Sequence, residues 1–230
     1  INSNLVELLK LCTQLEGNYK LRIGMLNPMY LTEILYDLIS VYKTEDKIFK
    51  FLHIPVQSGS NKILKQMYRG HDVKIFKKAV YEFRKSIPEI TIATDVIVGF
   101  PNESEEDFKL TIDLITETEP DIINISKYSQ RSGTVSSKLK NISSNQRKLR
   151  STILHDLSRG ISRRRNTLWE GWIGDVYIDE IKNTLVQGRN YAYKSVIINN
   201  ADKSNLNVGQ IIKVKVTDSS QYSLFGEGLF

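Results

Sequence analysis

Apolar and polar positions alternate along the first two thirds of the chain with two different periods. Segments whose apolar residues lie three or four positions apart predict helices, and near-continuous apolar, β-branched runs predict strands. The predicted helices span residues 4–15, 31–42, 60–68, 73–86, 103–119 and 144–165. The predicted strands span residues 19–26, 47–56, 90–100 and 121–128. Buried strands that alternate with helices predict an α/β fold with a parallel sheet covered by helices, and four strands are too few for a closed eight-stranded barrel.

The pattern changes after Trp169, where the helical period disappears. Short strands are predicted instead, separated by turns rich in Gly, Asn and Asp. They span residues 173–181, 195–198, 210–217 and 224–230. Such a tail is typical of a small all-β barrel or sandwich. We therefore expect two domains, residues 1–166 and residues 167–230.

The positive charge of the chain is concentrated in one segment. The 230 residues carry a formal net charge of +6. Residues 138–165 hold nine basic side chains and one acidic side chain, whereas residues 1–137 and residues 166–230 each carry a net charge of −1. A concentrated positive segment suggests a polyanionic partner, because phosphate contacts supply affinity that does not depend on sequence.

Cys12 is the single cysteine of the chain. One cysteine excludes an internal disulfide framework and fits a reducing compartment, so we expect a cytoplasmic protein. No apolar run approaches the ~18 residues that a membrane-spanning helix needs, so no membrane partner is expected. The three histidines, His53, His71 and His155, do not cluster in sequence, and no Cys/His spacing predicts a metal site.

Polar or small residues follow each predicted strand of the first domain. The stretches are residues 27–28 (NP), 57–60 (QSGS), 99–103 (GFPNE) and 129–134 (SQRSGT). Ligands of parallel α/β sheets bind at the carboxyl ends of the strands, so these stretches predict one shared rim. Each stretch also has a local explanation: Ser60 would cap the next helix, and glycines are common in turns.

Asp95 lies inside the apolar strand predicted over residues 90–100. A carboxylate there must be paired or must face a polar cavity, because burial of an unpaired charge is costly. Strand alternation places Asp95, Ile97 and Gly99 on one face. Two interpretations stay open, a structural ion pair and a carboxylate that faces a ligand site.

Basic and aromatic residues mark two candidate contacts with nucleic acid. The first is a basic run at the end of the last predicted helix, Arg163, Arg164 and Arg165. The second interleaves basic and aromatic side chains in the predicted barrel, at Arg189, Tyr191, Tyr193 and Lys194. Such interleaving suits base stacking beside phosphate contacts. The basic run equally fits a solvated helix face, and the tyrosines equally fit a core pair.

Several motifs resemble a known family. HIPVQSGS (residues 53–60), ATDVIVGFPNE (93–103) and INISKYSQRSGT (123–134), in this order, resemble the last strands of the radical S-adenosylmethionine methylthiotransferases. RIGMLNP (22–28) fits the preceding strand. The tail, with TLVQGRNYAYKSVII (184–198), resembles their C-terminal TRAM domain, an RNA-binding β-barrel. RIGMLNP and SKYSQRSGT are most similar to the archaeal and eukaryotic branch.

The resemblance implies a partial (β/α) barrel of radical-SAM type followed by a small OB-like TRAM barrel. It implies a transferase that adds a methylthio group to N6-threonylcarbamoyladenosine next to the anticodon of tRNA. The implied cofactors are S-adenosylmethionine and [4Fe–4S] clusters. Gln57 and Asp95 match positions that contact the ribose of S-adenosylmethionine in radical enzymes of this fold. The other residues implied at the cofactor rim are Ser58, Gly59, Gly99 and Arg131.

The sequence also departs from this family. It lacks the C-x-x-x-C-x-x-C motif that holds the radical cluster, and Cys12 alone cannot supply the thiolates. It lacks the first two strands of the family's barrel. We therefore expect no catalytic or metal-ligating residue in this chain. We expect the chain to be the C-terminal part of a longer enzyme, inactive without the N-terminal cluster-binding portion.

Two alternatives stay open. One is a cluster-free RNA-binding module with a degenerate barrel. The coding sequence upstream of Ile1 distinguishes it, because an in-frame cluster motif favours the enzyme and an immediate start codon favours the module. The other is an unrelated α/β enzyme with a β-barrel appendage, for which the sequence shows no nucleophile–base pair.

Overall fold

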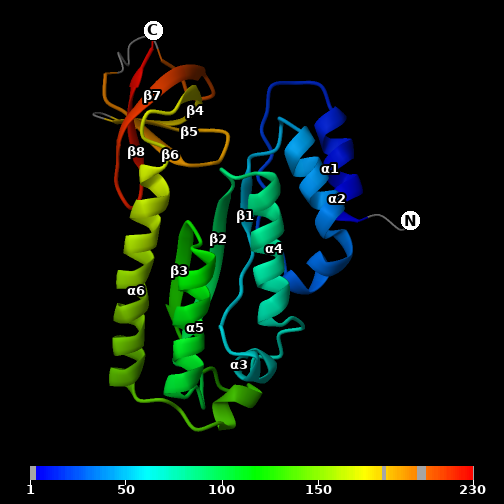
Figure 1. Cartoon of the computed structure of the whole chain (residues 1–230), viewed down its shortest axis with the longest axis vertical. Coiled ribbons are helices and arrows are strands. Elements are labelled where there is room, and N and C mark those ends of the chain that lie inside the picture. Colours follow the sequence, from blue (N-terminus) through cyan, green and yellow to red (C-terminus); the bar gives the residue numbers. More distant parts are fainter. Residues whose placement is uncertain (1–3, 183–184, 201–205, 230) are drawn as a thin grey trace.

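The structure is a computed structural model that describes residues 4–182, 185–200 and 206–229. Its first domain contains a parallel sheet in the order β1-β2-β3. The strands are β1 (Phe51–His53), β2 (Thr91–Val98) and β3 (Ile122–Lys127). Helices connect the strands and cover one face of the sheet (Figure 1). The predicted α/β fold with a parallel sheet is confirmed.

The helices follow the predicted periodic segments closely. They are α1 (Leu5–Gln14), α2 (Leu31–Thr44), α3 (Asn61–Gln66), α4 (Val73–Ser86), α5 (Glu105–Thr118) and α6 (Ser144–Thr167), with 3₁₀ turns at Pro28–Tyr30 and Val135–Lys138. Most α-helices begin at a side chain that accepts a hydrogen bond from a backbone N–H of the first turn. These capping residues are Asn4, Ser60, Asp72, Ser104 and Ser143.

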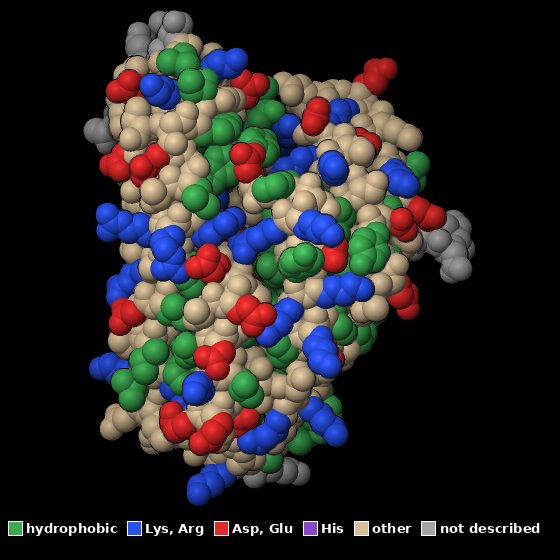
Figure 2. Space-filling model, viewed as in Figure 1, with side chains coloured by type: hydrophobic (Ala, Val, Ile, Leu, Met, Phe, Trp, Pro, Cys, Tyr) green, Lys and Arg blue, Asp and Glu red, His purple; other side chains and the backbone are tan. Residues whose placement is uncertain are grey.

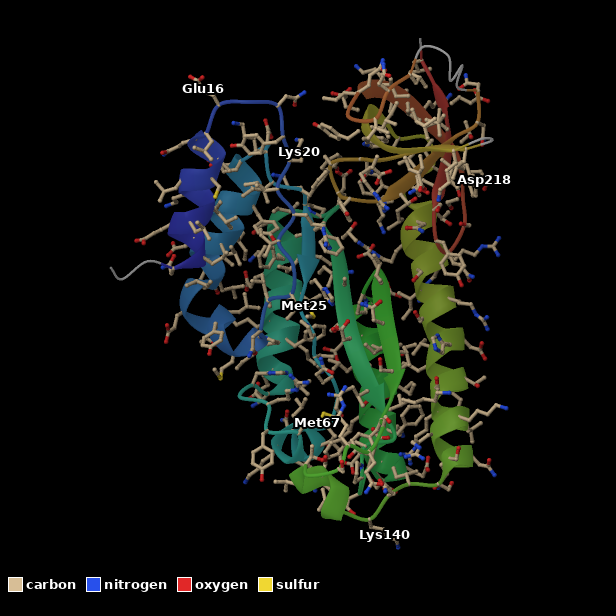
Figure 3. The ribbon with its side chains drawn as sticks, turned by 180° about the vertical axis from the view of Figure 1, so that it is seen from behind. Glu16, Lys20, Met25, Met67, Lys140 and Asp218 are labelled. Atoms are coloured by element: carbon tan, nitrogen blue, oxygen red, sulfur yellow. The ribbon has the colours of Figure 1, made fainter. Side chains whose placement is uncertain are left out.

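The two faces of β2 have different surroundings. Ile92, Val96 and Val98 are buried in the core beneath the helices. Asp95 and Ile97 alternate with them and are only partly buried. Seen from behind in Figure 3, the face of β2 and β3 away from α4 and α5 is not crossed by any of the drawn helices. Helices therefore cover one face of the sheet, whereas the other face is covered by the barrel near Ala93 and is open toward the carboxyl ends of the strands, where Asp95 lies.

The segment 19–26 does not form the predicted continuous strand. Its backbone pairs with the following segment through isolated parallel bridges at Leu21 and Met25. Gly24 lies between the bridges, and glycine weakens a strand interior. The neighbouring strand is itself short, because Pro55 lacks the N–H that a ladder needs. The segment therefore runs parallel to the sheet without a regular ladder.

The second domain is a closed barrel whose strands pair in the order β4-β5-β6-β8-β7. The strands are β4 (Ile173–Lys182), β5 (Leu185–Arg189), β6 (Ser195–Ile198), β7 (Ile211–Ser219) and β8 (Leu224–Gly228). Trp169 follows α6 directly and packs in the barrel core with Val176, Val196 and Val214. The predicted small β-barrel is confirmed.

The sequence pattern misses β5, and Gly188 gives the reason. A glycine in a short segment interrupts the apolar alternation that predicts a strand. An added Cβ at Gly188 would lie 2.4 Å from the carbonyl oxygen of Tyr177. The glycine thus permits the close approach of β4 and β5. Its lack of a side chain also removes the apolar residue by which β5 would have been predicted.

The barrel stands next to the amino ends of the sheet strands, at the end of α6 (Figure 1). The N–H of Lys50, just before β1, donates to the carbonyl oxygen of Tyr191 in the barrel at 2.8 Å. Phe49 packs edge-on against Tyr177 and Tyr193, with ring centroids 6.0 and 5.0 Å apart. The carboxyl ends of the strands, where the predicted rim lies, are at the opposite end of the sheet.

Candidate functional site

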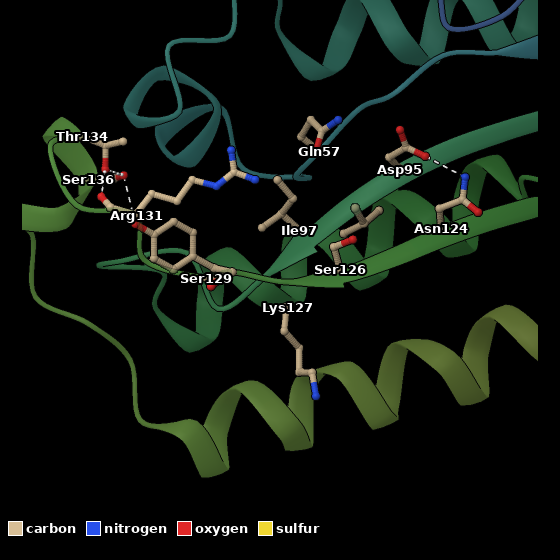
Figure 4. A pocket seen from close by; sticks show the side chains of 12 residues that line it. Gln57, Asp95, Ile97, Asn124, Ser126, Lys127, Ser129, Arg131, Thr134 and Ser136 are labelled. Atoms are coloured by element: carbon tan, nitrogen blue, oxygen red, sulfur yellow. Dashed lines mark hydrogen bonds between the residues drawn. The ribbon is translucent and has the colours of Figure 1, made fainter.

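A hollow of about 630 Å³ lies at the carboxyl ends of β2 and β3 on the open face of the sheet. The segments that follow β1 and β3 contribute to its walls (Figure 4). Its polar lining includes Gln57, Asp95, Asn124, Ser126 and Arg131. The volume lies within the range of roughly 300–1,000 Å³ that is typical of small-ligand sites. Three of the predicted rim residues, Gln57, Asp95 and Arg131, are thus brought together.

Asp95 is held by two neighbouring side chains. Its Oδ1 accepts a hydrogen bond from Nδ2 of Asn124 at 2.8 Å and lies 2.9 Å from Nε2 of His53 (Figure 4 shows the first contact). Asp95 and Asn124 are register partners in the β2–β3 ladder, which explains the contact. Within the described residues, Oδ2 has no hydrogen-bond partner. The carboxylate is therefore both paired and open to the hollow, so the two interpretations of Asp95 are compatible.

Gln57 closes the hollow from the loop after β1. Its backbone has a left-handed conformation (φ 72°), and both its N–H and its carbonyl oxygen form hydrogen bonds with β2. Its N–H donates to the carbonyl oxygen of Asp95 at 2.8 Å, and its own carbonyl oxygen accepts from the N–H of Ile97 at 2.9 Å. Its side-chain amide makes no hydrogen bond to any described residue. Arg131 points its guanidinium into the same hollow (Figure 4), so donors and acceptors face the space between them.

Ser58 and Gly59 do not line this hollow. Ser58 is fully buried, and its Oγ accepts a hydrogen bond from the N–H of Ser60 at 3.2 Å. Gly59 packs against α5, where an added Cβ would lie 2.3 Å from the carbonyl oxygen of Leu110. These two residues hold the loop that carries Gln57 rather than facing the ligand space.

Asp107 anchors the same loop to α5. Its Oδ1 accepts a hydrogen bond from Oγ of Ser60 at 2.7 Å, and its Oδ2 accepts from Nζ of Lys62 at 2.5 Å. Its Oδ2 also accepts from the N–H of Ser104 at 3.0 Å. Burial alone would raise the pKa of Asp107, but these hydrogen bonds together lower it to about 2. Ser60 also caps α3 through the N–H of Ile63, so the local explanation of this serine is confirmed.

Gly99 is held by a buried ion pair outside the hollow. Its N–H donates to Oε2 of Glu103 at 2.8 Å, and the same oxygen accepts from Nη1 of Arg150 at 2.6 Å. Burial raises the pKa of Glu103 despite these hydrogen bonds. The loop after β2 is therefore built around a structural pair, and Gly99 contributes to it through the backbone.

The basic run at residues 163–165 divides between the surface and the domain interface. Arg163 is exposed, and Arg164 donates to Oε1 of Glu119 at 2.6 Å at the surface. Arg165 is mostly buried and donates from Nε to Oδ1 of Asp121 at 3.2 Å. Lys and Arg side chains recur down the side of the molecule where α6 lies (Figure 2). Arg163 and Arg164 are therefore the two members of the run that remain on the surface.

Lys194 and Tyr193 lie in the interface between the domains. Nζ of Lys194 donates to Oδ1 of Asp121 at 2.8 Å and to Oδ1 of Asn166 at 2.9 Å. The guanidinium carbon of Arg22, from the first domain, lies 5.0 Å from the ring centroid of Tyr193. These barrel residues thus face protein groups of the first domain.

Arg189 and Tyr191 have different surroundings. Nε of Arg189 donates to Oδ2 of Asp179 at 2.7 Å, and its side chain remains partly exposed. Tyr191 packs beside Trp169 and Trp172, with ring centroids 5.7 and 6.1 Å apart. Tyr191 thus packs within the barrel, whereas Tyr193 packs against Phe49 and Phe51 of the first domain, so the two tyrosines have different partners and do not form the core pair that was one of their two interpretations.

Asn124 and Ser126 line the hollow although neither belongs to the predicted rim. Their signal in the sequence is the alternation INIS, which places two polar side chains on one face of an otherwise apolar strand. His53 lies four residues before Gln57 in the chain, but only the register of the sheet shows that it reaches Asp95.

Neither a metal centre nor a membrane span is found among the residues that the structure describes. No group of three or more His, Cys, Asp or Glu side chains in those ranges could hold a metal ion. Cys12 is in α1, and no cysteine lines the hollow, so the donors present do not fit an iron–sulfur cluster. No described helix is both long and apolar enough to cross a membrane.

Two family models match the chain, the radical SAM superfamily over residues 1–115 and the TRAM domain over residues 175–229. The chain therefore belongs to the radical SAM superfamily, with a TRAM domain after the sheet. Among solved structures, the radical SAM enzyme HemN from Escherichia coli matches with a TM-score of 0.52 and 16% identity, over 96% of this chain and 54% of that chain. This likeness supports the fold, a partial (β/α) barrel of radical-SAM type.

Curated relatives point to one group of enzymes within the superfamily, the tRNA methylthiotransferases. The chain is 41% identical to the "Probable threonylcarbamoyladenosine tRNA methylthiotransferase" of Archaeoglobus fulgidus over 97% of its length, and 41% identical to the protein of the same name in Methanocaldococcus jannaschii over 99%. It is 34% identical to the "tRNA-2-methylthio-N(6)-dimethylallyladenosine synthase" of Carboxydothermus hydrogenoformans over 96%. The match covers 51%, 51% and 50% of these relatives, so the chain spans about half their length. The predicted resemblance to the methylthiotransferases is confirmed.

Proposed function

We propose that this chain is the part of a tRNA methylthiotransferase that carries the rim for S-adenosylmethionine and the RNA-binding barrel. The longer enzyme adds a methylthio group to N6-threonylcarbamoyladenosine next to the anticodon. The observation that carries the proposal is one chain that combines a radical-SAM sheet, whose hollow is lined by Gln57 and Asp95, with a TRAM domain. Five archaeal relatives at 39–41% identity that bear this activity in their names support the choice of base.

S-adenosylmethionine fits the hollow through groups that the protein leaves available. Oδ2 of Asp95 and the amide of Gln57 suit the two ribose hydroxyls, and the guanidinium of Arg131 suits the carboxylate of the methionine moiety. The remaining predicted rim residues would support these groups from behind: Ser58, Gly59 and Gly99. When bound, S-adenosylmethionine supplies the radical chemistry from which the superfamily takes its name.

The [4Fe–4S] clusters must take their ligands from outside this chain. Clusters need several thiolates, and Cys12 is the only cysteine present. We therefore propose no catalytic residue here, and we propose the N-terminal cluster-binding portion of the same enzyme as the partner of this chain. A [4Fe–4S] spectrum after reconstitution of this chain with iron and sulfide would contradict the proposal.

For tRNA, we propose a surface that combines the TRAM barrel with the exposed side of α6. Arg163 and Arg164 supply phosphate contacts, while Arg189 and Tyr191 contribute from the barrel. The other predicted RNA contacts would act by holding the barrel in place: Arg165, Tyr193 and Lys194. We place the domain boundary between residues 166 and 167, and the protein in the cytoplasm, with which a lone cysteine agrees.

The longer protein provides the test of this function. It is expressed in cells that lack the modification, and tRNA nucleosides are analysed by mass spectrometry. We expect 2-methylthio-N6-threonylcarbamoyladenosine with the longer protein, none with its Asp95→Ala variant and none with the present chain alone. A longer protein that binds S-adenosylmethionine and tRNA but leaves the nucleoside unchanged would contradict the proposed function.

A further inference from the structure

The TRAM barrel and the hollow for S-adenosylmethionine lie at opposite ends of β3. The barrel contacts the amino end of this strand, where Lys194 binds Asp121. The hollow begins at Asn124 and continues beyond the carboxyl end of the strand. From Asp121, at the barrel contact, to Lys127, at the end of β3, the chain extends about 20 Å at ~3.3 Å per residue. An RNA held by the barrel must therefore extend along this strand to place a base in the hollow.

A second hollow occupies this stretch of the surface. It has a volume of about 680 Å³ and lies between β3, α6 and the turn that joins β7 to β8. Asn124 lines both hollows, so the two adjoin. In the order β1-β2-β3, the strand β3 is an edge of the described sheet, and its outer side faces the second hollow. The second hollow thus connects the barrel to the cofactor rim.

Tyr222 places a solvent-exposed aromatic ring at the barrel end of the second hollow. Its side chain is 77% exposed. Oγ of Ser220 accepts hydrogen bonds from the N–H of Tyr222 at 3.2 Å and of Ser223 at 3.1 Å. The carbonyl oxygen of Ser220 accepts from Nδ2 of Asn166, near the end of α6, at 2.8 Å. The backbone of the turn is therefore fixed, which places the exposed ring at this end of the hollow, where a base can stack on it.

The rest of the lining suits the other parts of a nucleotide. Ile122 contributes an apolar floor and is 41% exposed. His155 and Arg159 project from α6, and Ser158 adds a hydroxyl group. Arg159 pairs with Asp156 through Nη2, which leaves further N–H donors of the guanidinium for a phosphate. The site thus offers an aromatic platform, a hydroxyl group and a cation within one hollow.

We propose that the second hollow seats the nucleotides that flank the modified base. Tyr222 stacks on one base, Arg159 and His155 contact the backbone phosphate, and the strand passes Asn124 into the hollow for S-adenosylmethionine. The inference rests on the proposed function, because that function supplies the RNA. It adds a path for the RNA and residues that the predicted RNA contacts do not include.

Fluorescence anisotropy of a labelled anticodon stem-loop RNA with this 230-residue chain tests the path. Tyr222→Ala should raise Kd about 5-fold or more, the loss expected when one base–aromatic stack is removed. Tyr222→Phe keeps the ring and should retain the affinity of the unaltered chain. The matched control is Tyr81→Ala on α4, which removes a ring that is 63% exposed and lies outside the second hollow.

Variants that remove positive charge test the proposed path independently of Tyr222. His155→Ala with Arg159→Ala should weaken binding, whereas Lys109→Ala on the outer side of α5 should not. Thermal midpoints compare the stability of each variant with that of the unaltered chain. If the chain binds RNA and Tyr222→Ala matches Tyr81→Ala, the path is overturned and the proposed function stands. If the unaltered chain shows no binding to the RNA, the proposed RNA partner fails, and the path fails with it.

Discussion

Lys194 of the TRAM barrel donates a hydrogen bond from Nζ to Oδ1 of Asp121, 73 residues earlier in the chain, at 2.8 Å. The two side chains are 7% and 1% exposed. Asp121 also pairs with Arg84 at 3.3 Å and with Arg165 at 3.2 Å. Burial alone would raise the pKa of Asp121, but Lys194 and Arg165 hold it below its usual value. The domains are therefore joined by buried charges that compensate one another.

Lys194→Met should destabilise the chain by about 3 kcal/mol. Removal of one member of a buried ion pair leaves an uncompensated charge and typically costs ~3–5 kcal/mol. We expect the lower end because Arg84 and Arg165 remain beside Asp121. Urea unfolding gives the measurement. Lys182→Met is the control, because its exposed pair with Glu180 is worth about 1 kcal/mol at most. Equal losses in the two variants would show that the buried pair does not stabilise the junction.

Asp95→Asn should raise the Kd of the longer enzyme for S-adenosylmethionine about 10-fold or more. A hydrogen bond to a charged group is worth ~1.5–3 kcal/mol, and the amide keeps the shape but removes the charge. Asn124→Leu should raise this Kd less, because Asn124 orients the carboxylate of Asp95, which itself binds the ligand. Isothermal titration calorimetry gives both values.

Asp113→Asn is the matched control for Asp95→Asn. Asp113 is exposed on α5, outside the hollow, so its loss of charge should leave the affinity for S-adenosylmethionine unchanged. An equal effect of both aspartate variants would mean that the carboxylate at the carboxyl end of β2 does not bind the ligand.

Much of the fold and the centre of the site could be predicted from the sequence. The spacing of apolar residues shows which side of each segment is buried, and that spacing differs between helices and strands. The segments could therefore be assigned before the sheet that buries them was known. Asp95 stood out because a carboxylate in an apolar strand requires a partner or a polar cavity, and the structure provides both. The expectation that polar residues after the strands share one rim is met at Gln57, because parallel strands present their carboxyl ends at the same edge of the sheet.

The contacts of the barrel residues could not be predicted in the same way. A lysine and a tyrosine in a basic, aromatic stretch fit RNA, and they equally fit a carboxylate and aromatic rings of a distant segment. Lys194 meets Asp121, and Tyr193 meets Phe49, through contacts that only the relative placement of the two domains determines. Local composition carries no signal for a partner this far away in the chain.

Arg163→Ala combined with Arg164→Ala should flatten the salt dependence of tRNA binding. Each phosphate contact contributes roughly 0.7–0.9 to the slope of log K against log salt concentration, so two lost contacts lower its magnitude by roughly 1.4–1.8. Lys43→Ala with Lys109→Ala removes the same charge from other helices and should leave the slope unchanged. Arg165→Ala should instead lower stability, because Arg165 supports Asp121. An unchanged slope in the arginine variant would mean that this part of α6 is only a solvated face.

Asp107 should make the anchoring of the Gln57 loop sensitive to acid. Hydrogen bonds from Lys62, Ser104 and Ser60 outweigh burial and lower its pKa to about 2. A carboxyl whose folded pKa lies below the unfolded value of ~3.9 stabilises the fold above that pH, and the contribution is lost as the pH falls from about 4 toward 2.

Asp107→Asn removes the charge and keeps the shape, so it isolates this contribution. The stability gap between the unaltered chain and Asp107→Asn should be constant from pH 7 down to roughly 5 and should close below about pH 4. Urea midpoints at stepped pH values measure the gap. Asp113→Asn, on the exposed side of the same helix, should show a small gap at every pH. A gap for Asp107→Asn that persists unchanged at low pH would mean that the ionised carboxylate does not hold the loop, and that the shape of the side chain alone anchors Ser60 to α5.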